Sequence, residues 1–246
     1  MSGLDYSKAI EIDPNIYWIG FDENESGLHC NPYLIEDENE AILVEPGSVT
    51  HFPYVYEKVK SVIDLHKINY ILASHQDPDL CASIPLFKEK INNKELKIIT
   101  HSRASFLIEH YGAHIPYYLV DQNNWTLTLK SGRLFRFIFT PYLHFPGAFV
   151  TYDEKSEILF SGDLFGGLSF DWQLYSNDHY IEAVKAFHEN YMPSKEILAY
   201  SMNKIEQLNL KMIAPQHGSI ILKEIIPQVI NELKNLDCGD YLFEQE

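Results

Sequence analysis

A short polar run directly follows a strand-like apolar segment, and this junction constrains the fold more than any other feature of the chain. The apolar residues are Tyr70-Ile71-Leu72-Ala73, and Ser74-His75-Gln76-Asp77-Pro78-Asp79-Leu80 follows at once. One imidazole and two carboxylates therefore occupy alternate positions on a tight loop at the end of a buried strand. Side chains at alternate positions can point to the same side, as the ligands of a metal ion must.

Three further candidate ligands lie in similar surroundings. They are His144 in Pro-Tyr-Leu-His-Phe-Pro-Gly, Asp163 in Leu-Phe-Ser-Gly-Asp-Leu-Phe-Gly, and His217 in Ile-Ala-Pro-Gln-His-Gly. Each follows an apolar stretch and has Gly or Pro nearby, which is typical of a loop at a strand end. Any one of them alone is more typical of a cap, a core residue or an ordinary turn. Together, three His and three Asp suffice for a two-metal centre, and the whole set favours metal binding.

The rest of the chain alternates between strand-like and helix-like segments. The predicted strands cover residues 16–21, 32–36, 41–45, 70–73, 96–100, 117–120, 125–129, 134–140, 148–152, 158–161 and 212–214. The predicted helices cover residues 52–66, 84–91, 102–111, 178–189, 194–207 and 221–236. Each half thus has strands followed by helices. We therefore expect a single α/β (α+β) domain over residues 1–246, with two mixed sheets face to face and helices outside, a four-layer αβ/βα sandwich.

Charge and composition narrow the classes of function. The chain has 35 acidic and 19 basic residues and a formal net charge of −16, which disfavours nucleic-acid and anionic-membrane partners. No apolar run is long enough to span a membrane, and the N-terminus lacks a signal-peptide pattern, so we expect a cytoplasmic protein. The three cysteines, Cys30, Cys81 and Cys238, lie far apart, which predicts buried thiols over a disulfide framework or a thiolate metal site.

The ligand series resembles that of the metallo-β-lactamase superfamily. The matching motifs are His75-x-Asp77-x-Asp79, then His144, Gly162-Asp163 and His217-Gly218. Hydrolases of that superfamily carry His-x-His-x-Asp-His in the first motif. Aspartate at the second position is similar instead to the His-x-Glu-x-Asp-His of flavodiiron proteins. The phrases at residues 31–35 and 159–166 also resemble that branch, so the resemblance runs from about Tyr17 to His217. It implies the metallo-β-lactamase-like sandwich and a di-iron centre.

The resemblance assigns six ligands: His75, Asp77 and His144 to metal one, Asp79 and His217 to metal two, and Asp163 as the bridge. There are two departures from the family pattern. Asp77 replaces the usual glutamate, and Leu80 stands where the family has a histidine ligand of metal two. Metal two is then one protein ligand short, leaving it weak, open to water or O2, or filled by another residue such as His29. Two further residues, Tyr142 and Cys81, are candidates for supporting positions beside the metals.

The donor set also bears on the identity of the metal. Carboxylates mixed with imidazoles suit iron or manganese, whereas extra His or Cys would favour zinc. Three aspartates and one bridging hydroxide carry four negative charges and balance two divalent ions, and a bound peroxide would balance the charge gained when both ions are oxidised. We therefore expect two iron ions as cofactor, and no FMN domain in this chain.

Flavodiiron proteins carry a flavodoxin-like domain that delivers electrons, and this sequence shows no FMN phosphate loop. The chain is more similar to small oxygen-binding di-iron proteins that act as sensors in bacterial signalling, including chemotaxis. The main hypothesis is a non-haem di-iron protein that binds and senses O2, through a diferric-peroxo state, and signals to a protein partner. One alternative is an O2 or NO reductase that depends on an external electron donor; the other is a binuclear-metal hydrolase. Whether the chain is an enzyme is left open, and no catalytic residue is assigned; an enzyme would be an O2 or NO oxidoreductase rather than a hydrolase.

Some features of the sequence do not separate the alternatives. Tyrosine-rich stretches at residues 111–118 and 168–180 are candidates for carrying a signal, although ordinary packing explains them equally well. The physiological ligand and a homodimer are left open. The remaining histidines are expected on the surface or on helix faces; they are His51, His66, His101, His110, His114, His179 and His188.

Overall fold

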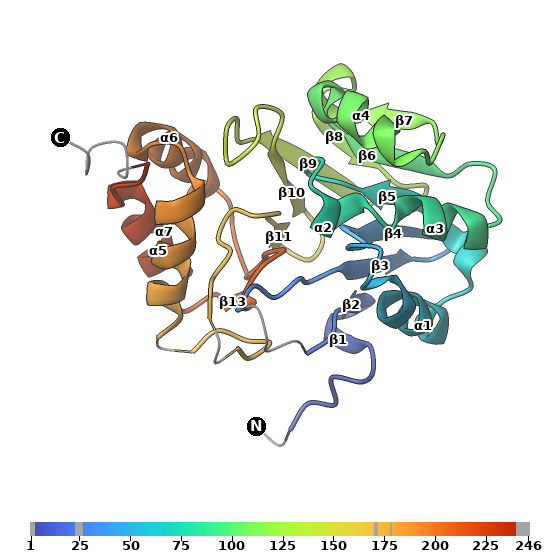
Figure 1. Cartoon of the computed structure of the whole chain (residues 1–246), viewed down its shortest axis with the longest axis horizontal. Helices are drawn as coiled ribbons and strands as arrows, with labels where there is room; N and C mark the ends of the chain where they lie inside the picture. The colour runs from blue at the N-terminus through green and yellow to red at the C-terminus, as the bar shows by residue number, and fades with distance from the viewer. Residues whose placement is uncertain (1–2, 23–26, 170–171, 178, 240–246) are drawn as a thin grey trace. The chain divides into compact units, whose positions relative to one another are not determined.

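Two mixed β-sheets form the framework of the computed structural model, which describes residues 3–22, 27–169, 172–177 and 179–239 (Figure 1). The first sheet has the order β1-β2-β3-β4-β5-β6-β7 and the second β13-β12-β11-β10-β9-β8. By compactness the chain divides into a first unit, Met1–Asp22 with Cys30–Phe135, and a second unit, Glu23–His29 with Arg136–Glu246.

The first sheet changes from antiparallel to parallel pairing at its centre. Its strands are β1 (Ile10–Asp13), β2 (Ile16–Trp18), β3 (Tyr33–Asp37), β4 (Glu40–Val44), β5 (Ile68–Leu72), β6 (Lys97–Thr100) and β7 (Tyr117–Leu119). Neighbours from β1 to β4 are antiparallel, and those from β4 to β7 are parallel. The carboxyl ends of parallel strands meet at one edge of a sheet, where ligand sites gather. Glu45 after β4 and the polar run after β5 lie at that edge.

Proline marks the start of most α-helices of the first unit. They are α1 (Phe52–Val62), α2 (Pro78–Cys81), α3 (Ile84–Lys90) and α4 (Ser102–Ile108), followed by the short 3-10 turn η2 (Glu109–Tyr111). Proline lies in the first turn of α1, α2 and α3, where its missing N–H costs nothing. The single turn α2 therefore starts inside the polar run and holds Asp79 and Leu80 on helical backbone.

The second unit contributes most of the other sheet and three helices. Its strands are β9 (Leu134–Phe139), β10 (Phe149–Asp153), β11 (Ile158–Phe160), β12 (Met212–Ala214) and β13 (Ile221–Leu222); β8 (Thr126–Thr128) precedes them in the chain. Helix α7 (Ile226–Asn235) packs against α5 (Tyr180–Tyr191) and α6 (Lys195–Ile205). Strands β11 and β12 are parallel, so the loops that carry Asp163 and His217 leave the sheet at the same edge.

The structure confirms the mixed α/β class and two mixed sheets. The prediction of one helix over residues 221–236 is wrong, because Ile221 and Leu222 form β13 and pair with β12. Helix α7 begins only at Ile226, with Pro227 in its first turn. Residue 178, the expected start of α5, lies outside the described residues. A single domain over residues 1–246 stays a prediction. Among the described residues, no helix is long and apolar enough to cross a membrane.

Candidate metal centre

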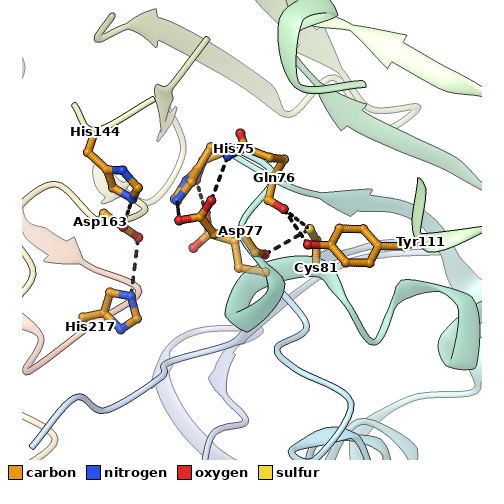
Figure 2. A network of polar contacts seen from close by, with 10 residues as sticks. His75, Gln76, Asp77, Cys81, Tyr111, His144, Asp163 and His217 are labelled. Carbon is orange, nitrogen blue, oxygen red and sulfur yellow. Dashed lines mark hydrogen bonds and ion pairs between the residues drawn. The ribbon is translucent and has the colours of Figure 1, made fainter. Parts of the chain in front are cut away.

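The carboxylate of Asp163 lies between two imidazoles of the second unit, each facing a different oxygen (Figure 2). His144 Nε2 is 3.0 Å from Oδ2, and His217 Nε2 is 3.5 Å from Oδ1. Asp163 and His217 are buried, and the His144 side chain is partly exposed. A carboxylate that bridges two metal ions also directs one oxygen to each ion. Each ion could then bind one Asp163 oxygen and the imidazole that faces it.

The hydrogen bonding of His217 suits a cation at its Nε2. Its Nδ1 lies 2.9 Å from the carbonyl oxygen of His29, which can only accept, so Nδ1 carries a proton. If this imidazole is neutral, its Nε2 lone pair faces the Asp163 carboxylate, another electron-pair donor. A metal ion bound between these two electron-pair donors would remove the repulsion between the Nε2 lone pair and the carboxylate oxygen. An imidazole whose other nitrogen is held by a carbonyl is the usual arrangement of a metal-bound histidine.

Helix α5 holds the loops of Asp163 and His217 through two buried side chains. Tyr180 donates its hydroxyl proton to the carbonyl oxygen of Phe165 at 3.2 Å and accepts from the backbone N–H of Ser219 at 3.0 Å. His188 accepts from the Phe165 N–H at 3.1 Å and donates from Nδ1 to the Val184 carbonyl. Burial lowers the pKa of His188 to about 4, so this histidine is neutral at pH 7.

Close packing restricts the loop after His217. Gly218 has φ +77°, and a Cβ there would collide with Tyr180 Oη. The Gly218 carbonyl accepts a 2.8 Å hydrogen bond from Trp172 Nε1. The Trp172 ring in turn stacks on His29, with ring centroids 4.1 Å apart and 4° between the planes. The position of His217 is therefore fixed by contacts on both sides of its loop.

In the first unit, a buried chain of polar groups orients His75. The Ser74 hydroxyl donates to the Glu45 carboxylate, and His75 Nδ1 lies 3.2 Å from Ser74 Oγ. Because the serine proton is directed to Glu45, Ser74 Oγ accepts from the Nδ1–H of His75. This tautomer leaves Nε2 as the metal-binding nitrogen. His75 Nε2 lies 3.6 Å from Asp77 Oδ2, so the first two residues of the motif point to the same side.

Tyr111 and Cys81 hold the backbone at Gln76 and Asp77 by hydrogen bonds to its carbonyl oxygens (Figure 2). Tyr111 donates its hydroxyl proton to the Gln76 carbonyl at 2.9 Å. The Cys81 thiol lies 3.2 Å and 3.1 Å from the carbonyl oxygens of Gln76 and Asp77. Burial raises the pKa of this thiol, which keeps it protonated as a donor. Gln76 Nε2 also donates to Asp77 Oδ1 at 2.7 Å, which orients that carboxylate.

The polar run at residues 74–80 ends with a carboxylate, Asp79, and a hydrocarbon side chain, Leu80. Asp79 is partly buried, whereas the Leu80 side chain is fully buried in α2 and offers no donor atom. Within the first unit, the donor atoms of Cys30 and Asp79 lie within 4.8 Å of one another. Sequence reasoning did not select Cys30, because it lies far from Asp79 in the chain.

The three other residues proposed to support the metals, His29, Cys81 and Tyr142, differ in their burial and contacts. His29 is buried and stacked on Trp172, and its carbonyl positions His217. Cys81 holds the loop through backbone carbonyls. Tyr142 has a side chain that is about half exposed (48%).

Two of the histidines expected on the surface or on helix faces are buried, although His188 does lie on a helix. His188 is fully buried on α5, and His101 caps α4 by accepting from the Arg103 N–H. Sequence reasoning also missed Glu45, Ser74, Tyr180 and Trp172, since hydroxyl and indole groups have no fixed spacing from the ligands that they support.

The fold is that of metallo-β-lactamase-like flavodiiron cores. The crystal structure of the flavodiiron protein from Giardia intestinalis superimposes with a TM-score of 0.81 at 21% identity, covering 95% of this chain and 60% of that one. The match therefore defines the class of fold.

The family follows from three further matches. A family model described as "ODP family beta lactamase" matches residues 28–218, so the chain belongs to the ODP family. A structure described as the peroxy diiron species of the chemotaxis sensor ODP has a TM-score of 0.81 and 30% identity. It covers 96% of this chain and 98% of that one. The apo state of the chemotaxis sensor ODP from T. denticola matches with a TM-score of 0.77.

Curated relatives extend the comparison to longer proteins. The flavo-diiron protein FprA2 of Clostridium acetobutylicum is 26% identical over 234 residues, which cover 88% of this chain and 58% of that protein. The nitric oxide reductase of Moorella thermoacetica is 27% identical over 240 residues, with 89% and 59% covered. The chain thus spans less than two thirds of the length of these relatives.

Proposed function

We propose that this protein is a non-haem di-iron protein that binds and senses O2. The observation that carries the proposal is the Asp163 carboxylate, whose two oxygens each face a different imidazole Nε2. Membership of the ODP family supports the same reading. So does the likeness, over nearly the full length of both chains, to a structure described as a peroxy diiron chemotaxis sensor.

The proposal keeps the six ligands that the sequence motifs select. They are His75, Asp77, Asp79, His144, Asp163 and His217. Two iron ions held by these residues would supply the two electrons that bound O2 requires. The surrounding residues keep the imidazole protons of His75 and His217 on Nδ1, which leaves Nε2 free of a proton to bind metal. Ser74 and Glu45 keep the His75 proton on Nδ1, and the His29 carbonyl does the same for His217.

Signalling to a protein partner belongs to the same proposal. It is supported by the description of the similar structure as a chemotaxis sensor. Within the first unit, the ligand-bearing backbone at Gln76 is joined to η2 through the Tyr111 hydroxyl. A change in the backbone conformation at Gln76 would therefore be passed to η2, where the residues on either side of Tyr111 are exposed. The homodimer and the cytoplasmic location stay predictions.

An O2 or NO reductase that uses an external electron donor is the second candidate, favoured by the similarity to a nitric oxide reductase. Oxygen consumption by the iron-loaded chain separates the two. A sensor takes up about one O2 per pair of irons and then stops, even with a reducing system present. A reductase continues at a steady rate. Asp163→Asn is the matched control, since it removes the charge of the bridge but keeps the shape of the side chain. Sustained consumption by the unaltered protein, absent from the control, would replace the sensor proposal with the reductase.

A further inference from the structure

The proposed second metal lacks one ligand relative to the family pattern. Leu80 occupies the position of the missing histidine, and its fully buried side chain is a hydrocarbon. Asp79 precedes it in the same helical turn. If metal two is bound as proposed, the missing position is either open to water or O2 or filled by another donor near Asp79.

Cys30 has the position and the chemistry of that donor. The residue is buried, with 5% of its surface exposed. Its Sγ lies within 4.8 Å of an Asp79 carboxylate oxygen in the same unit. Metal–sulfur and metal–oxygen bonds of about 2.3 and 2.1 Å together approach this separation. Next to Cys30, the Asn31 side chain accepts a 2.9 Å hydrogen bond from Trp18 Nε1, and both residues are buried. The thiol therefore projects from an anchored segment.

Cys81 provides an internal contrast. It is also buried and lies only two residues from Asp79. Its thiol, however, is directed at the backbone carbonyls of Gln76 and Asp77. A thiol that donates to carbonyls is protonated and does not bind metal. Proximity in sequence therefore points to Cys81, whereas the thiol of Cys30 lies within 4.8 Å of the Asp79 carboxylate.

We propose that Cys30, as a thiolate, is a ligand of metal two beside Asp79 and compensates for the histidine replaced by Leu80. The inference rests on the proposed di-iron centre. On binding, the S–H proton passes to solvent and a sulfur–metal bond forms. The thiolate adds one negative charge to the three aspartates and one bridging hydroxide. Oxidation of both ferrous ions then leaves one uncompensated positive charge in place of two. A thiolate thus favours the oxidised pair and lowers its midpoint potential.

Anaerobic titration of the metal-free full-length chain with Co²⁺ tests the assignment. A thiolate on Co²⁺ gives an intense charge-transfer absorption in the near ultraviolet, which oxygen and nitrogen ligands do not produce. We expect this band in the unaltered protein and in Cys238→Ala, which removes a buried thiol of the second unit. Cys30→Ala should lose the band and bind its second Co²⁺ at least tenfold more weakly, while the first Co²⁺ is retained. Cys30→Ser, closer in size, should also lose the band and raise the midpoint potential of the iron-loaded site.

The outcomes separate this inference from the proposed function. Two Co²⁺ ions bound by the unaltered chain without a charge-transfer band would overturn the Cys30 assignment and leave the di-metal centre standing. The same holds if the band persists in Cys30→Ala or Cys30→Ser. Binding of fewer than two ions by the unaltered chain would overturn the proposed centre itself, and the ligand with it.

Discussion

Replacing Tyr180 with phenylalanine tests whether α5 holds the two ligand loops of the second unit. The side chain is buried, and its hydroxyl makes one hydrogen bond to each loop, with the Phe165 carbonyl and with the Ser219 N–H. Phenylalanine has almost the same shape, so packing changes little. The substitution removes the partner of one buried acceptor in the Asp163 loop and of one buried donor in the His217 loop.

The size of the effect follows from these two groups. A buried polar group that loses its partner costs about 1 to 1.5 kcal/mol at the lower end of measured values, so we expect Tyr180→Phe to lose about 2 to 3 kcal/mol. At about 2 to 4 °C per kcal/mol for a chain of this length, the melting temperature should fall by about 4 to 12 °C. Urea and thermal denaturation of the metal-free protein measure both quantities. Metal affinity should fall as well, because the Asp163 and His217 loops lose a shared anchor.

Tyr200→Phe is the matched control, because it removes a hydroxyl from a tyrosine of α6 that is about half exposed (53%). It should change the free energy of unfolding by less than about 0.5 kcal/mol. If Tyr180→Phe is as mild as this control, the reasoning is refuted, and the ligand loops are held by other contacts.

Four further perturbations probe separate parts of the account. Asp163→Ala should abolish paired metal binding, because the bridge disappears, and two irons per chain in that variant would show that the ligand assignment is wrong. Leu80→His, made in the Cys30→Ala background, should strengthen metal two and change oxygen reactivity; unchanged values of both would contradict the ligand deficit assigned to Leu80. Glu45→Gln should weaken metal one about tenfold in a chelator competition, because the serine that orients His75 loses its charged acceptor, and equal affinity would exclude that role. His188 has a pKa of about 4 when folded, against 6.5 for the unfolded chain, so the unfolded chain binds the proton first as pH falls from 6.5 to 4. Stability should therefore drop by about 2 kcal/mol between pH 7 and pH 5, and His188→Gln should remove that part of the slope in urea denaturation.

Periodicity and turn residues were enough to predict most of the fold. Prolines and glycines marked the ends of elements, and the apolar runs near Tyr70, Leu159 and Met212 correspond to β5, β11 and β12. The failure at Ile221 has a clear cause. A two-residue strand carries no periodic pattern, and its apolar residues merge with those of the following helix.

The sequence allowed candidate ligands to be selected where they follow strand ends. His75, Asp163 and His217 could be selected because each comes directly after a buried strand. The groups that orient them could not, because Tyr180 and His188 act across tertiary contacts that leave no fixed spacing in the sequence. Cys30 is the sharpest case: its thiol comes near Asp79 only through the fold.

Anaerobic loading with ferrous iron, followed by admission of O2 without reductant, tests the central claim most directly. Iron per chain and the visible absorption spectrum are recorded on the same sample. The account predicts two irons per chain and a long-lived visible band that appears on adding O2. A chain that prefers zinc, or that holds two irons yet gives no such band with O2, would contradict it.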